Sequence, residues 1–149
     1  MHKLPSSPNP VVLRTEGQVK DSDYGLRKQL PGIAFGQAVE QVTAALKGEG
    51  FGVLTTIDVK ATLKEKIDVD FRPYVILGAC NPQLANRALS HDDTIGLLLP
   101  CNVVVAETED GSEVAIAKPT ATLAIAGEAA MGGFADEAEA RLSRALKAL

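Results

Sequence analysis

The sequence is poor in aromatic residues and in cysteine, and it has no tryptophan. Of its 149 residues, four are Phe, two are Tyr and two are Cys. So few aromatic rings argue against a surface on which nucleic-acid bases would stack. Two cysteines are too few for the disulfide framework of a small secreted protein.

Excess positive charge and long apolar runs are absent as well. The formal net charge is -4 and the isoelectric point is near 5.2, which disfavours binding to a nucleic-acid backbone. The first ten residues lack the apolar segment of a signal peptide. The apolar run over 97–106 is broken by Pro100 and Asn102, far short of the ~20 residues that span a bilayer. We therefore expect a cytoplasmic protein that binds neither nucleic acid nor membrane.

Familiar catalytic motifs are missing too. There is no Walker loop, no Gly-x-Ser-x-Gly elbow and no His-Glu-x-x-His helix. His2 and His91, the two histidines, do not combine with the cysteines into a zinc pattern. The sequence therefore assigns no catalytic residue and no cofactor. A soft metal such as copper held by both thiols remains an alternative.

The length suits one domain preceded by a tail. Residues 1–17 carry several prolines and no apolar period, which predicts a flexible tail, and residues 18–149 then form a single domain. Apolar periodicity predicts strands at 24–30, 51–57, 74–79, 101–107 and 112–117, and helices at 35–47, 59–66, 119–126 and 134–149, with a further helix starting at 81 or 82. Asp110-Gly111 is a favoured hairpin turn. We predict an α+β fold, with a mixed, largely antiparallel sheet and helices packed against it in two layers.

Cys80 is the first candidate for chemistry, because it directly precedes Asn81-Pro82. Asn is a good helix N-cap and Pro suits the first helical turn. A thiol beside the free N–H groups of that turn would have a lowered pKa and would be reactive. The alternative is a buried, inert cysteine of the core, as free cysteines usually are.

Cys101 lies in a similar context, since it is followed by Asn102 as Cys80 is by Asn81. Strand ends and helix starts from distant parts of a chain often meet at one rim of a sheet. The two thiols could meet in this way, and a disulfide would need Cα atoms within about 7 Å.

A basic group is the second candidate. Lys60 and Lys64 lie one turn apart on a predicted helix, and Arg72 follows soon after. Together they could hold a phosphate or a carboxylate. The alternative is a solvated helix face whose charges are paired with neighbouring carboxylates, namely Glu65, Asp68 and Asp70.

Four motifs resemble a known family in their order and content. They are Gly50-Phe51-Gly52-Val53-Leu54-Thr55-Thr56-Ile57-Asp58-Val59-Lys60, Phe71-Arg72-Pro73-Tyr74, Leu77-Gly78-Ala79-Cys80-Asn81-Pro82 and Ile95-Gly96-Leu97-Leu98-Leu99-Pro100-Cys101-Asn102-Val103. Over 25–149 the chain resembles the family called domain of unknown function 302. The resemblance implies a compact α/β domain of bacterial and archaeal type that tends to form homodimers, and it implies no established activity. The matching positions include both cysteines, Arg72, Tyr74, Asn81 and Asn102.

Three hypotheses about function follow. The first is a binding module for a small anionic or thiol-reactive ligand, in which Cys80 is the reactive or coordinating group. Its candidate site residues are Lys60, Lys64, Arg72, Tyr74, Cys80, Asn81, Cys101 and Asn102. The second is a structural homodimer without a small-molecule site. The third is a thiol-dependent enzyme, which would need a base near its nucleophile, and neither histidine is well placed in the sequence for that role.

Overall fold

The computed structural model describes residues 19–127 and 133–149. In these residues one antiparallel sheet has the strand order β1-β2-β6-β5-β4-β3. Its strands are β1 (Val19–Asp21), β2 (Gly25–Pro31), β3 (Gly52–Asp58), β4 (Tyr74–Cys80), β5 (Cys101–Thr108) and β6 (Gly111–Ala117). The helices are α1 (Phe35–Gly48), α2 (Val59–Ile67), α3 (Pro82–His91), α4 (Pro119–Thr122) and α6 (Phe134–Lys147), with the 3-10 helices η1 (Asp93–Leu98) and η2 (Leu123–Ala126). The predicted α+β class and largely antiparallel sheet are confirmed.

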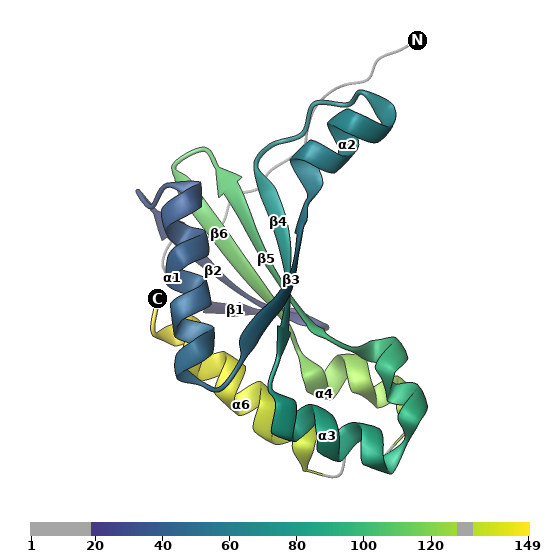
Figure 1. Ribbon diagram of the computed structural model, residues 1–149. Helices are drawn as coiled ribbons and strands as arrows, with labels where there is room; N and C mark the ends of the chain where they lie inside the picture. The colour runs from purple at the N-terminus through teal and green to yellow at the C-terminus, as the bar shows by residue number, and fades with distance from the viewer. Residues whose placement is uncertain (1–18, 128–132) are drawn as a thin grey trace.

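The helices occupy three different places around the sheet (Figure 1). Helices α1 and α6 lie against one face of the sheet and contact each other. Helices α3 and α4 gather at one end of the strands, whereas α2 projects from the opposite end, between β3 and β4. No helix in the described part of the chain is long and apolar enough to cross a membrane.

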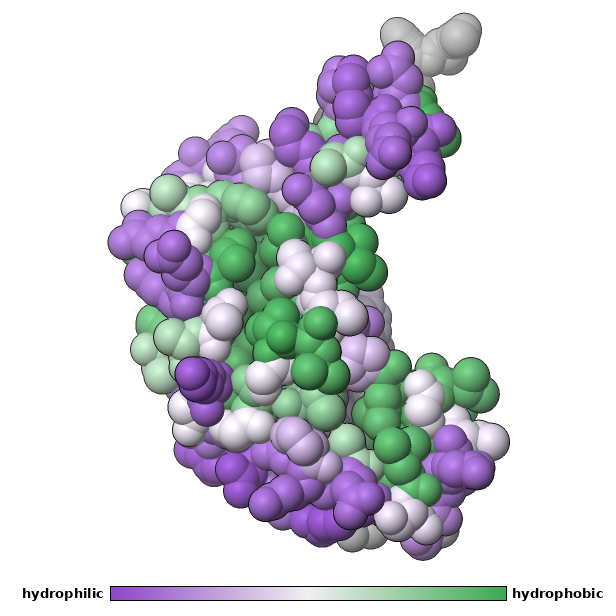
Figure 2. Space-filling model, in the orientation of Figure 1, coloured by the Kyte–Doolittle hydropathy of each residue, from purple (hydrophilic) through white to green (hydrophobic). Residues whose placement is uncertain are grey.

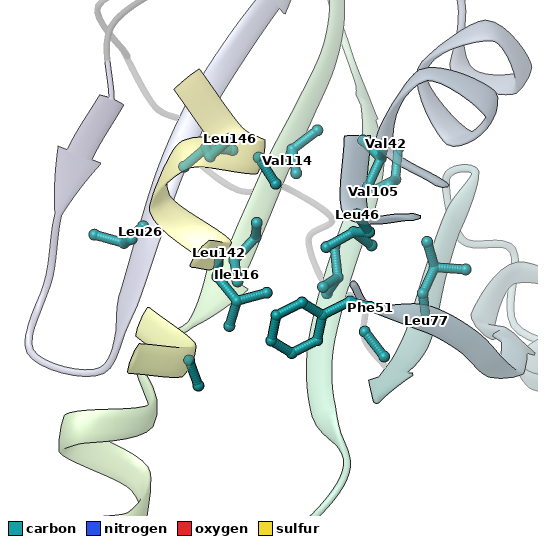
Figure 3. Packing of buried hydrophobic residues seen from close by; sticks show 14 of the residues in the cluster. Leu26, Val42, Leu46, Phe51, Leu77, Val105, Val114, Ile116, Leu142 and Leu146 are labelled. Carbon is teal, nitrogen blue, oxygen red and sulfur yellow. The ribbon is translucent and has the colours of Figure 1, made fainter. Parts of the chain in front are cut away.

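The hydrophobic core fills the space between the sheet and helices α1 and α6 (Figure 3). Helix α1 buries Ala38, Val42 and Leu46, which recur every four residues and so share one face. Strand β5 buries Val103 and Val105 on the same side of the sheet, as the two-residue period of a strand requires. Each such large side chain contributes about 1.5–3 kcal/mol when it leaves water. This core makes the sheet and the two helices one rigid scaffold.

Two elements were not predicted from the sequence. Strand β1 has three residues and pairs with β2 at the edge of the sheet. The 3-10 helix η1 is capped by Asp92, whose Oδ1 accepts a hydrogen bond from the backbone N–H of Thr94 at 3.0 Å. Such short elements bury too few side chains to produce an apolar period. The predicted tail, residues 1–17, lies outside the described residues.

Strand β3 contains a bulge that the sequence pattern did not reveal. Val53 pairs with Ala79 and Thr55 pairs with the next residue of β4, Gly78, so Leu54 is an extra residue without a partner. Thr55 therefore faces the opposite side of the sheet from Val53, and the predicted alternation along this strand does not hold. The side chain of Leu54 is 67% exposed.

Candidate functional site

The candidate site begins where β4 passes into α3. Cys80 is the last residue of β4, Asn81 is the N-cap and Pro82 opens the helix, as the sequence predicts. Asn81 Oδ1 accepts a hydrogen bond from the backbone N–H of Leu84 at 3.1 Å. This cap satisfies one of the free donors of the first turn and sets the direction in which α3 leaves the sheet.

Cys101 reaches the same place from the neighbouring strand. It is the first residue of β5 and pairs with Ala79, the residue before Cys80. Cys80 lies one residue further along β4 than the partner of Cys101, so the alternation of a strand directs the two side chains to opposite faces of the sheet. Both are free thiols that are half-buried. Both cysteines therefore lie at the same end of the sheet, whereas a contact between the two thiols stays a prediction.

Both cysteines line one apolar pocket of about 370 Å³, which we call the thiol pocket. It lies at the α3 end of the sheet, beneath α3 and beside α4 and α6. The described residues that line it are Phe51, Leu54, Thr55, Ala79, Cys80, Asn81, Leu84, Ala85, Ala88, Leu89, Gly96, Leu99, Pro100, Cys101, Pro119, Leu123, Phe134 and Ala138. Figure 2 shows that hydrophobic side chains also gather on the surface at this end of the molecule.

The electrostatics of the thiol pocket favour neutral groups. None of its described lining residues is Asp, Glu, Lys, Arg or His. Burial raises the pKa of the Cys101 thiol to about 11, and the nearby charge of Cys80 adds to the rise. At neutral pH Cys101 is therefore a protonated, weakly polar part of the wall.

The side chains of Thr55 and Pro100 close over Gly78 in the middle of this region. A Cβ built on Gly78 would collide with Thr55 Oγ1 and would lie 2.9 Å from Pro100 Cγ. Thr55 and Pro100 both line the thiol pocket. Glycine is thus required at position 78 for β3 and the start of β5 to close over β4.

The basic candidates lie at the other end of the sheet, around α2. Lys64 Nζ contacts Asp68 at 2.9 Å and Asp70 at 3.3 Å, and these carboxylates raise the pKa of the lysine. Lys60 Nζ donates to the carbonyl oxygen of Phe71 at 3.1 Å. A hollow between α2 and residues 69–71 contains both lysines together with Asp58 and Asp70, so its charges are mixed.

Arg72 and Tyr74 belong to this same end. The Arg72 guanidinium lies 5.8 Å from the ring centre of Phe71 and 5.7 Å from that of Tyr74. Tyr74 starts β4 and Cys80 ends it, which separates them by about 20 Å at the usual rise of a strand. The structure therefore brings Cys80, Asn81 and Cys101 together and keeps Lys60, Lys64, Arg72 and Tyr74 apart from them.

Comparisons with known proteins identify the family of this chain. The family model described as "Domain of unknown function DUF302" matches residues 26–149. The chain belongs to the DUF302 family. A similar solved structure is that of an uncharacterized conserved protein DUF302 from Bacillus stearothermophilus, at 34% identity and a TM-score of 0.72. The match covers 83% of this chain and 94% of that one. No curated protein matches the chain.

The remaining candidates of this DUF302 domain lie outside the thiol pocket. Asn102 is opposite Gly78 in the β4–β5 ladder, is exposed and is not among the lining residues. His91 is exposed at the end of α3. Over residues 19–127 and 133–149, no group of three or more His, Cys, Asp or Glu side chains could hold a metal ion.

Several residues that line the thiol pocket of this DUF302 domain were not predicted as site residues from the sequence. Phe51 precedes β3, Leu123 starts η2, and Phe134 starts α6. Each is an ordinary core residue in its own element, so the local pattern contains no sign of a pocket. Only the fold, which brings these distant segments to one end of the sheet, creates the cavity.

Proposed function

We propose that this DUF302 domain is a small-ligand-binding module whose site is the thiol pocket. The observation that carries the proposal is that two cysteines from different strands line one apolar cavity of about 370 Å³. Small-molecule sites commonly have volumes of about 300–1,000 Å³ and mostly apolar walls with a few polar groups. Thr55 and Asn81 are such groups.

The rim of the thiol pocket supports the proposal. Leu54 and Leu89 line the pocket, yet they are 67% and 39% exposed. Leu97 on η1 and Ile125 on η2 are still more exposed, at 87% and 82%, and lie next to or near lining residues. Large exposed apolar side chains that cluster at a cavity are typical of a binding surface.

The proposal is tested with the neutral fluorescent probe N-phenyl-1-naphthylamine. We expect saturable binding, and we expect Ala85→Leu to weaken it by at least ~10-fold, because the larger side chain fills the pocket from α3. Asn86→Leu is the matched control, since residue 86 is exposed on the same helix and outside the pocket. Absence of saturable binding, or equal losses in the two variants, would refute the proposal.

The thiols add chemistry to this site without making it an enzyme. We propose that Cys80 is the thiol that a reactive ligand would meet, because the burial that protonates Cys101 leaves that residue unreactive. A thiol-dependent enzyme would need a proton acceptor beside the sulfur. The described lining of the thiol pocket contains no His, Asp or Glu, so this alternative is the weaker one. Two free thiols suit the reducing cytosol, where we propose that the protein acts.

Self-association is the second candidate function, and the α2 end of the molecule favours it. Helix α2 has no buried residue, and β3, which leads into it, is the last strand in the sheet order. Ile57, Ile67 and Val69 are exposed there. An edge strand beside exposed apolar side chains is a surface on which a second copy can pack.

Sedimentation velocity tests the homodimer. We expect a dimer for the unaltered chain and for Thr62→Glu, an exposed position on α2, and we expect a monomer for Ile67→Glu. The reason is that a charge placed in an apolar interface must lose its water without gaining a partner. A chain that sediments as a monomer at all concentrations would refute this candidate.

A further inference from the structure

The described side chains that line the thiol pocket include no charged partner for a charged ligand. Its described lining has no ionisable side chain apart from the two thiols, and Cys101 stays neutral. Asn81 Oδ1 is already used as the cap of α3. The polar atoms that remain in the lining side chains, the amide nitrogen of Asn81 and the hydroxyl of Thr55, can serve a neutral polar group.

Charged side chains do occur on the helices that line the pocket, but they bind one another. Arg87 on α3 contacts Glu137 on α6 at 3.0 Å. Arg141 contacts the same carboxylate at 3.1 Å and also donates to the carbonyl oxygen of Glu49 at 3.3 Å. The two arginines hold the pKa of Glu137 below its usual range. This network ties α3 to α6, and none of its three charged side chains is among the described lining residues of the pocket.

The size and chemistry of the cavity limit the ligand further. A volume of about 370 Å³ is near the lower end of the range for small-molecule sites. The buried rings of Phe51 and Phe134 and the two sulfur atoms form soft, polarisable walls. Sulfur and aromatic groups pack well against rings and against one another.

We infer that the ligand of the thiol pocket is a compact, uncharged molecule that is apolar over most of its surface, and that its anionic analogues are excluded. This inference rests on the proposed function and names the class of its ligand. The basic group of α2 cannot assist an anion there, because it lies at the opposite end of β4, about 20 Å away.

The test compares two ligands that share one ring system, 1-naphthalenemethanol and 1-naphthoate, by isothermal titration at pH 7.5. We expect the neutral alcohol to bind and the carboxylate to bind at least ~30-fold more weakly, since a buried carboxylate without a partner is strongly disfavoured. Leu54→Arg places a cation at the rim of the pocket and should recover binding of 1-naphthoate. Ala85→Leu should weaken binding of the alcohol, whereas Asn86→Leu should not.

The outcomes separate the ligand class from the proposed function. If both compounds bind equally and Ala85→Leu weakens both, the ligand class is overturned and the binding site stands. If neither compound nor the fluorescent probe binds, the proposed function itself is overturned. Binding of the alcohol that Ala85→Leu leaves unchanged would overturn the assignment to this pocket.

Discussion

Burial of the Cys101 thiol should make the stability of this domain fall at alkaline pH. The folded chain raises the pKa of this thiol from 9.0 to about 11. Below pH 9 the folded and unfolded states both keep the proton, so the thiol contributes no pH dependence. Between pH 9 and 11 the unfolded chain releases its proton while the folded chain keeps it, and the free energy of unfolding falls. Two pKa units correspond to a loss of about 3 kcal/mol, of which about 2 kcal/mol is reached at pH 11 and the rest above it.

Urea unfolding at several pH values between 8 and 11, with a reductant present, measures this loss. The comparison with Cys101→Ala removes the contribution of all other titrating groups, because they are common to both proteins. The fall between pH 8 and 11 should be larger in the unaltered chain by about 2 kcal/mol. Cys80→Ala should keep most of the fall, since burial is the larger cause of the shift and the charge of Cys80 the smaller one. An equal fall in the unaltered chain and in Cys101→Ala would show that the reasoning is wrong.

Three further predictions concern stability, and chemical denaturation checks each of them. Asn81→Ala removes the N-cap of α3 and should cost about 1 kcal/mol, whereas Asn81→Asp keeps an accepting oxygen and should cost less. Gly50→Ala and Gly32→Ala both place a side chain at positive φ, at +84° and +77°. Only the new side chain at position 50 also meets a neighbour, Asn81 Nδ2 at 2.8 Å, so Gly50→Ala should lower the stability more. Equal losses would contradict the packing described here. Leu142→Ala, at a fully buried position of α6, should cost about 2–5 kcal/mol, and a loss under about 1 kcal/mol would contradict its place in the core.

Local chemistry explains the parts of the fold that could be predicted. The hairpin between β5 and β6 was predicted around Asp110-Gly111, and its turn is one residue earlier, at Glu109 and Asp110, with Gly111 opening β6. The start of α3 follows from Asn81 and Pro82 alone. The buried face of α1 can be predicted from the spacing of its own apolar residues. In each case the information lies within a few residues, so the sequence is sufficient.

The features that could not be predicted depend on distant contacts. Apolar periodicity predicts a helix at 59–66, yet α2 has no buried residue, because no described element packs over it. The bulge at Leu54 is set by pairing with β4, which a single strand cannot reveal. For the candidate site, the strand–helix junction at Cys80 and Asn81 could be predicted from local chemistry, and its role as a site stays a prediction. The distance between the two cysteines and the lysines Lys60 and Lys64 could not be predicted, because it depends on the direction of β4 in the folded sheet.

The bulge in β3 also bears on how relatives of this domain can diverge. Because Leu54 has no partner in the ladder, a deletion of this one residue would leave Val53 and Thr55 pairing with consecutive residues of β4. Every other pair of the sheet could stay in register, and the core would keep its contacts. The same deletion would remove a side chain from the rim of the thiol pocket. Deletion of one codon could thus change which ligands the cavity binds and leave the rest of the fold unchanged.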